Sequence, residues 1–169
     1  MTSYKAYMRI KAAKQGTITG SVTQKGREGS IAVIACHHEI VSPRDPQSGL
    51  PTGKRQHQPF TVTKPTDKST IQLYSALTTN ETLTEVVIDF LRQQIKAGKG
   101  AANAPWVAYY TVHLTNASIS AINFAMPNLE DPAQKTFKIH EQVSFAYQKI
   151  TWTWSDGGKT TSDDWATHL

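Results

Sequence analysis

The chain has 169 residues, of which 38% are hydrophobic and 18% are charged, and its net charge is +5. This length suits one globular domain, over residues 1–169, because domains commonly hold roughly 100–200 residues. The basic residues are spread along the chain rather than clustered, so the charge does not favour a nucleic-acid partner.

Cysteine content and hydropathy limit the cellular context. Cys36 is the only cysteine, so no internal disulfide can form. The first residues lack the charged and then apolar pattern of a signal peptide. No apolar stretch approaches the roughly 20 residues that span a bilayer, so no membrane insertion is expected. We expect folding in a reducing cytoplasm and, if the protein leaves the cell, export that is independent of a signal peptide.

The N-terminal segments are typical of β-strands. Polar and apolar residues alternate over 4–11, which predicts a half-buried strand, and 17–22 forms a second, shorter candidate. Residues 31–41 (IAVIACHHEIV) have apolar residues on both faces. That pattern predicts a strand at a sheet centre or between two layers.

Residues 42–58 differ in character from the segments on either side. Four prolines and glycines, Pro43, Pro46, Gly49 and Pro51, are followed by the basic sequence 53–57 (GKRQH). Neither a helix nor a strand ladder tolerates so many breakers. Because a loop of this length is usually either functional or disordered, we interpret it as an arm that protrudes from the domain.

The middle of the chain predicts a strand over 58–64, a helix over 67–79 and a strand over 82–91. Asp67 is placed to cap the first turn of the helix, and Leu73, Ala76 and Leu77 form its apolar stripe. The glycines of 97–100 (AGKG) predict a flexible connection.

The C-terminal part predicts strands over 106–115, 117–125 and 138–154, with a loop over 126–135. Residues 156–158 (DGG) supply the positive φ angles of a tight turn, which predicts a C-terminal hairpin over about 140–165. Trp152 and Trp154 share one face of this hairpin with Ile150. We assign both indoles to the domain core first and to an interface second.

Nine or so strands with one helix indicate a mainly β protein. Too few helices lie between strands for a parallel, doubly wound sheet. The predicted architecture is an antiparallel β-barrel or two-sheet sandwich with one flanking α-helix and a long protruding loop.

Two groups of residues resemble functional sites, one for metal binding and one for acid–base catalysis, but the sequence supports neither function. In a strand, Cys36 and His38 point one way while His37 and Glu39 point the other, so at most two of them could ligate one metal ion. The simpler interpretation places Cys36 in the core and the histidines at a sheet surface. The pair at 163–164 (DD) resembles an acid–base pair, but adjacent carboxylates beside a hairpin are more often solvated.

Motifs of nucleophile elbows, phosphate loops and dinucleotide sites are absent from the sequence. We therefore expect no enzyme activity, no catalytic residues, no cofactor and no metal.

Four landmarks in register resemble one family. They are residues 27–31 (REGSI) entering a strand, 53–60 (GKRQHQPF), 63–70 (TKPTDKST) opening a helix, and 149–154 (KITWTW) before 156–158 (DGG). The chain is similar, over nearly its whole length, to Hcp, the haemolysin-coregulated protein of bacterial type VI secretion. It departs from the family pattern at 98–100 and 126–132, where lengths vary among members.

The resemblance implies a β subunit that closes into six-membered rings, which stack into the inner tube of the secretion apparatus. It implies sheath, spike and baseplate proteins as partners and small effector proteins in the lumen. The protein would be made in the bacterial cytoplasm and exported to the medium or a target cell.

A ring requires two different patches on each subunit, and the arm can supply one of them. We predict subunit or ring contacts at the arm residues Ser42, Arg44, Lys54, Arg55 and His57. The alternative is a monomeric β-barrel that binds a small ligand or nucleic acid through aromatic residues at its mouth. Native mass separates the two interpretations, with six copies against one.

Overall fold

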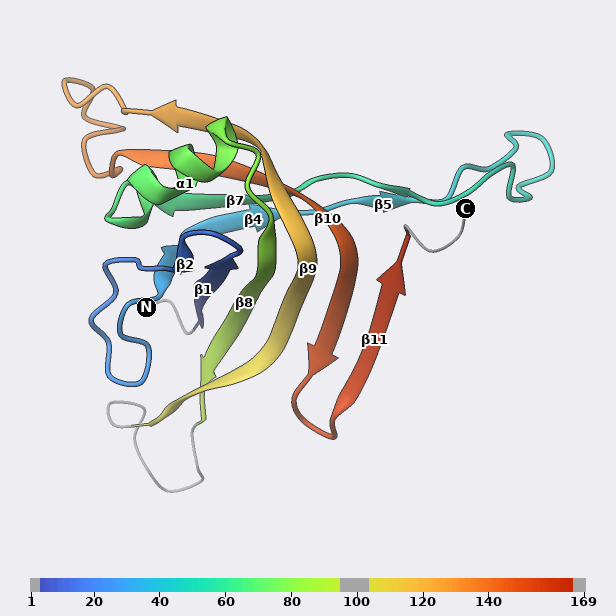
Figure 1. Cartoon of the computed structure of the whole chain (residues 1–169), viewed down its shortest axis with the longest axis horizontal. Coiled ribbons are helices and arrows are strands. Elements are labelled where there is room, and N and C mark those ends of the chain that lie inside the picture. Colours follow the sequence, from blue (N-terminus) through green and yellow to red (C-terminus); the bar gives the residue numbers. More distant parts are fainter. Residues whose placement is uncertain (1–3, 95–103, 166–169) are drawn as a thin grey trace.

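The computed structural model describes residues 4–94 and 104–165 as a curved antiparallel sheet with one helix (Figure 1). The predicted connection at 97–100 lies outside these ranges. The elements, in chain order, are β1 (Tyr4–Ala12), β2 (Gly16–Ile18), β3 (Ile31–Val33), β4 (Ala35–His37), β5 (Ile40–Val41), β6 (Gln56–His57), β7 (Phe60–Pro65), α1 (Ser69–Thr78), β8 (Leu83–Gln93), β9 (Trp106–Ala125), β10 (His140–Trp154) and β11 (Lys159–Asp164).

The main sheet has the order β2–β1–β8–β9–β10–β7–β4, with β11 paired to β10 and β3 paired to β1. Every pairing is antiparallel, as the sequence predicted. A second, two-stranded sheet joins β5 to β6 at the root of the arm. The predicted fold class is therefore confirmed, and of the two architectures offered the structure is sandwich-like.

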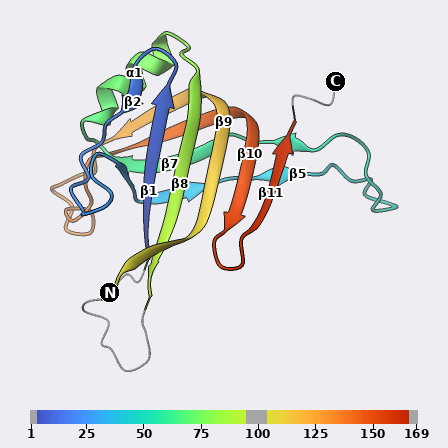
Figure 2. The ribbon, with the colours of Figure 1, turned by 60° about the horizontal axis from the view of Figure 1, so that its bottom comes forward.

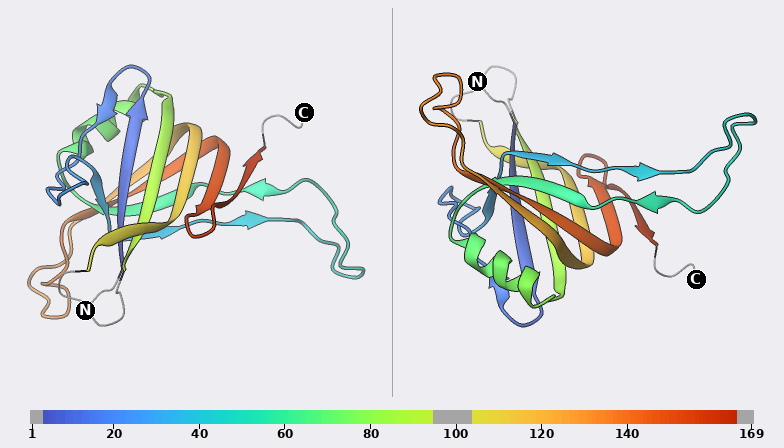
Figure 3. Two further views of the ribbon diagram at one scale, coloured as in Figure 1. Left: turned by 90° about the horizontal axis from the view of Figure 1, so that it is seen from below. Right: turned by 90° about the horizontal axis from the view of Figure 1, so that it is seen from above.

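The two longest strands, β9 and β10, run through both layers of the sandwich. The first part of β10 pairs with β7, whereas its last part pairs with β11. Register shifts at Ser144/Phe145 in β10 and at Phe90/Leu91 in β8 bend the sheet, as bulges do. Figures 2 and 3 show β8, β9 and β10 arching over the strands β4 and β7. The sheet thereby faces itself across one apolar core.

The core is a single cluster built from inward-facing residues of both layers. Met8 and Ile10 of β1 meet Val62 of β7 and Phe145 of β10, and each of these side chains is at most 1% exposed. The alternation predicted for residues 4–11 and 58–64 supplies these positions because successive side chains of a strand point to opposite faces. Leu73 and Ala76 bury the apolar stripe of α1 against the same cluster.

The start of α1 agrees with the sequence prediction in part. The helix begins at Ser69 rather than at residue 67, and its N-cap is Lys68, whose side chain makes no capping hydrogen bond. Asp67 Oδ1 accepts a hydrogen bond of 3.0 Å from the Ser69 amide and another from the Ser69 hydroxyl. The Asp67 carboxylate therefore satisfies one of the amides that the first turn of a helix leaves unpaired.

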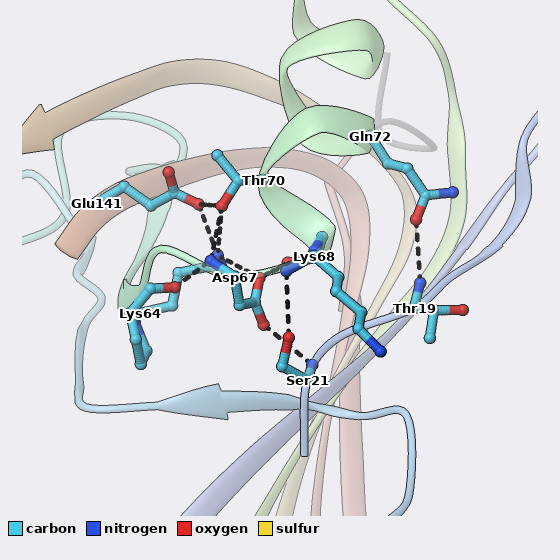
Figure 4. A network of polar contacts seen from close by, with 10 residues as sticks. Thr19, Ser21, Lys64, Asp67, Lys68, Thr70, Gln72 and Glu141 are labelled. Carbon is cyan, nitrogen blue, oxygen red and sulfur yellow. Dashed lines mark hydrogen bonds and ion pairs between the residues drawn. The ribbon is translucent and has the colours of Figure 1, made fainter. Parts of the chain in front are cut away.

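A buried ion pair lies next to this helix start and was not predicted. Lys64 of β7 and Glu141 of β10 are register partners, both side chains are 0% exposed, and Lys64 Nζ lies 2.5 Å from Glu141 Oε1. Lys64 also contacts Asp67 at 3.0 Å, and the Thr70 hydroxyl donates to Glu141 at 2.9 Å. Figure 4 shows how this network joins two strands to the N-terminus of α1.

The prediction of one central strand over 31–41 was wrong. The segment forms β3, β4 and β5, and β4 lies at an edge of the sheet. A bend at Ile34, whose amide donates to the Thr63 carbonyl, lets β3 pair with β1 and β4 pair with β7. One face of this edge remains uncovered, which is why Ile34 is 56% exposed.

Two further expectations need correction. Residues 106–125 form one strand rather than two, because the ladders with β8 and β10 continue on both sides of Asn116. Asn116 itself adopts a positive φ of 49°. Trp154, assigned first to the core, is 42% exposed, whereas Trp152 packs partly against the core cluster. The predicted turn is confirmed, since Gly157 and Gly158 have φ of 81° and 64° and β11 pairs back on β10.

Candidate assembly interface

The arm is the most prominent surface feature of the protein. Residues 42–55 leave the sheet between β5 and β6 and project far beyond one end of the sandwich (Figure 1). The pairing Ile40↔His57 and Val41↔Gln56 closes its root, and an isolated bridge joins Arg44 to Pro51 further out. The breakers in the sequence prevent a long ladder but leave the two limbs of the arm side by side (Figure 3).

The tip of the arm is a tight, self-supported turn. The Asp45 amide donates to the Leu50 carbonyl at 2.9 Å, and the Asp45 carboxylate accepts hydrogen bonds from the Ser48 hydroxyl and amide. The hydrogen bond from Ser48 lowers the pKa of Asp45, so the carboxylate is ionised at neutral pH. Leu50 stands directly across the turn from Asp45 and is 64% exposed. The tip therefore presents one apolar side chain beside one negative charge.

Of the five predicted interface residues, Ser42, Arg44 and Lys54 are exposed along the arm. Arg55 and His57 instead contact the same chain at the root of the arm. The Arg55 guanidinium forms a two-pronged ion pair with Asp163 of β11, with its Nη2 atom 2.7 Å from Oδ1. The structure thus separates an exposed part of the arm from a part that anchors it.

His57 extends the anchor into the molecule. Its side chain is 3% exposed, and its Nε2 atom lies 2.7 Å from Asp163 Oδ2. On its other side, Nδ1 lies 2.8 Å from the Tyr147 hydroxyl, which also lies 2.6 Å from His38 Nε2. The Tyr147 hydroxyl therefore lies between the rings of His38 and His57.

The pKa values follow from these contacts. The hydrogen bond from Arg55 holds the pKa of Asp163 below its ordinary value, and the contact with His57 acts in the same direction. Burial lowers the pKa of His38, and the neighbouring rings of His57 and His37 lower it further. Burial raises the pKa of Tyr147 well above its usual range, so this hydroxyl stays protonated. Trp165 closes the cluster by stacking on His57 and donating to the Tyr147 carbonyl at 2.6 Å.

These contacts correct two interpretations of the sequence. Cys36 is exposed rather than buried in the core, because β4 is an edge strand. Asp163 is not a solvated charge but the centre of the arm anchor.

Within 4–94 and 104–165, no group of three or more histidine, cysteine or acidic residues is placed to hold a metal ion. Sequence reasoning missed Tyr147 and Asp163 because their partners lie about a hundred residues away.

A second surface lies at the other end of the sandwich. A groove of about 840 Å³ runs between β3, the end of β7 and the loop that joins β9 to β10. Its apolar lining includes Ile34, Met126 and Phe137, which are 56%, 61% and 60% exposed. Apolar side chains that are exposed together in this way commonly mark a site of protein association.

The fold defines a class of protein, a β-sandwich with a long anchored arm and an exposed apolar groove. The family model described as "Type VI secretion system effector, Hcp" matches residues 7–154. The "Major exported protein" of Pseudomonas aeruginosa is 41% identical to this chain, and the alignment covers 95% of this chain and 94% of that protein. The chain belongs to the Hcp family.

Solved structures agree with this assignment. A double mutant of the Hcp1 protein from E. coli EAEC 042 is 34% identical, with a TM-score of 0.81 over 95% of this chain and 98% of that one. The secreted protein Hcp3 from Pseudomonas aeruginosa is 33% identical, with a TM-score of 0.74 over 96% and 98%. The chain is therefore a tube protein of type VI secretion and an exported protein. The alternative of a monomeric binding module is not supported.

The matched family is one of secreted tube proteins, and no enzyme family is indicated. No helix in the described ranges has the length and apolarity that crossing a bilayer requires.

Proposed function

We propose that six copies of this chain close into a ring and that rings stack into the inner tube of the secretion apparatus. The observation that supports this most directly is the arm, a segment of 14 residues between β5 and β6 that extends away from the core that its own chain provides. An arm of this kind is useful when another subunit covers it. The number six comes from the family. The arm and the apolar groove are two dissimilar surfaces, and a closed ring requires such a pair, which supports the proposal.

The five arm residues would have two different roles, contact with another subunit and positioning of the arm. Ser42, Arg44 and Lys54 are exposed, and we assign to them the contact with an adjacent subunit or ring. Arg55 and His57 would contribute by holding the root of the arm at a fixed angle through Asp163. A fixed root reduces the conformational entropy that the arm loses when it docks.

The remaining partners follow from membership of the apparatus. A tube that is propelled outward would meet sheath, spike and baseplate proteins, and a ring would leave a lumen for small effector proteins. The proposed role is structural rather than catalytic. Contacts between rings should be weaker than contacts within a ring, because the tube has to come apart after delivery.

Native mass spectrometry of the purified protein tests the ring. We expect a dominant species of six copies, with few longer stacks, at micromolar concentration. The triple change Arg44→Ala, Lys54→Ala and Arg55→Ala should weaken assembly and secretion. The matched control is Lys25→Ala with Lys68→Ala, which removes exposed charges outside the arm. A monomer at all concentrations would refute the ring, and an unaffected triple variant would refute the role of the arm.

A further inference from the structure

Both limbs of the arm are tied to the main sheet through one hydroxyl group. Tyr147 of β10 places its hydroxyl oxygen 2.6 Å from Nε2 of His38, which lies two residues before β5. The same oxygen lies 2.8 Å from Nδ1 of His57, in β6. Because β5 and β6 form the two sides of the root, a change in the hydrogen bonds of this hydroxyl acts on both limbs.

The single hydrogen atom of this hydroxyl limits how many protons the two rings can carry. The Tyr147 hydroxyl can donate its hydrogen to one ring nitrogen and accept a hydrogen from the other. At least one of the two facing nitrogens therefore has to be without a proton. If both rings are imidazolium ions, both facing nitrogens are donors, and the hydroxyl hydrogen loses its acceptor. Tyr147 is 4% exposed, and a buried donor without a partner is destabilising.

The surroundings of the two rings also oppose a second positive charge. His38 faces the Tyr147 hydroxyl of β10, the Phe60 ring of β7, the imidazoles of His57 and His37, and the Gln58 carbonyl. Within the described residues, none of the interactions that influence the pKa of His38 involves a carboxylate. His57 faces Asp163 of β11 and the Trp165 ring, and this carboxylate already pairs with Arg55. A proton on both rings would therefore leave one positive charge without a partner.

The other groups of the cluster keep their protonation state in mild acid. The hydrogen bond from Arg55 lowers the pKa of Asp163, so the carboxylate remains ionised at pH 5. Burial raises the pKa of Tyr147, so the hydroxyl keeps its hydrogen. Burial and the neighbouring imidazoles lower the pKa of His38, although the Gln58 carbonyl acts the other way. An open root therefore takes up a proton that the closed root excludes, and acid favours opening.

We propose that His38, Tyr147 and His57 form a latch that holds the root of the arm at neutral pH and releases it when mild acid places a proton on both rings. Release separates the two limbs from β10 and lets the arm change its angle. The latch is a property of one chain. Its consequence for assembly rests on the ring proposed above, since rings whose arms are held should be most stable at neutral pH and should loosen in mild acid.

Hydrogen exchange measured by mass spectrometry at pH 7.5 and at pH 5 tests the latch, with rates corrected for the intrinsic pH dependence of amide exchange. The probes are peptides that report the β5–β6 pairing and the Gln58 amide, which donates to the Glu39 carbonyl at 3.0 Å. While the closed root excludes the proton, its opening constant rises about tenfold per pH unit below the ordinary histidine pKa of 6.5. We expect an increase that approaches about thirtyfold between the two pH values.

Two variants remove the latch in different ways. His38→Gln can still pair with the Tyr147 hydroxyl but takes up no proton, so its root should remain protected at pH 5. Tyr147→Phe removes the shared hydroxyl, so its root should be less protected at pH 7.5 and should change little on acidification. The matched control is His140→Gln, which removes an imidazole that hydrogen-bonds the Lys138 carbonyl, and it should open as the wild type does.

Peptides of β8 and native mass on the same samples separate the possible outcomes. Loss of protection in β8 at pH 5 would indicate unfolding of the whole chain and would overturn a local latch. A change of less than about threefold at the root, or equal opening of wild type and His38→Gln, would overturn the latch and leave six-membered rings intact. A monomer at both pH values whose root opens in acid would support the latch and overturn the ring.

Discussion

The buried ion pair between Lys64 and Glu141 allows a quantitative prediction. Both side chains are 0% exposed, and Lys64 Nζ has Glu141 Oε1 at 2.5 Å and the Pro65 carbonyl at 2.9 Å (Figure 4). Glu141 Oε2 is buried and has no hydrogen-bond partner, so the carboxylate depends on Lys64 for compensation. In Lys64→Met, Glu141 would keep the Thr70 hydroxyl alone.

The expected cost of Lys64→Met is about 3–5 kcal/mol, the range for breaking a buried pair by removing one partner. For a chain of this size each kcal/mol lowers Tm by roughly 2–4 °C, so the loss should be on the order of 10 °C. The double variant Lys64→Met with Glu141→Leu removes both charges of the pair and should recover most of this loss, because apolar residues of similar volume often replace a buried pair without loss. Asp67 would lose its 3.0 Å contact with Lys64 but keep its hydrogen bonds from Ser69.

Urea unfolding at one fixed protein concentration measures both effects, since assembly makes the apparent stability depend on concentration. Additive losses in the double variant would refute the reasoning, because residues in one network should couple by about 0.5–3 kcal/mol. A loss below about 1 kcal/mol for Lys64→Met would refute it equally, since a surface pair contributes no more than that.

Three further predictions concern other parts of the structure. Gly20→Ala should lower the free energy of unfolding by about 1–3 kcal/mol, because a Cβ atom there would lie 2.3 Å from the Ser30 carbonyl oxygen and the backbone would have to move. Asp163→Asn should release the root of the arm from Arg55 and speed tryptic cleavage within the arm at neutral pH. His38→Gln should flatten the dependence of Tm on pH. Because the pKa of His38 is lowered on folding, its contribution is complete above the ordinary value of 6.5 and is lost as the pH falls below that value.

Each of these predictions has a matched control. Gly53→Ala should change stability by less than about 0.5 kcal/mol, since the new Cβ would meet no atom within 4 Å. Asp156→Asn, in the turn of the same hairpin, should leave tryptic cleavage of the arm unchanged. His140→Gln replaces an imidazole that hydrogen-bonds the Lys138 carbonyl, outside the cluster around His38, and should keep the pH dependence. Equal effects of a variant and its control would contradict the contact assigned to that variant.

The sequence by itself determined the features that depend on neighbouring residues. Period-two alternation placed Met8, Ile10 and Val62 in the core, because side-chain direction in a strand is a local property. The breakers of 42–58 predicted the arm, although residues 56–57 of this range form β6 at its root. Asp67 before the helix and the glycines at 157 and 158 acted through their own backbone geometry.

Only the tertiary structure decided which distant residues meet. Lys64 and Glu141 occupy inward positions of their strands and could be recognised as a pair only from the register between β7 and β10. Asp163 became an anchor because the hairpin brings it to Arg55. The exposure of Cys36 follows from the position of β4 at an edge. The order and register of strands are set by contacts far apart in the chain, and local composition does not encode them.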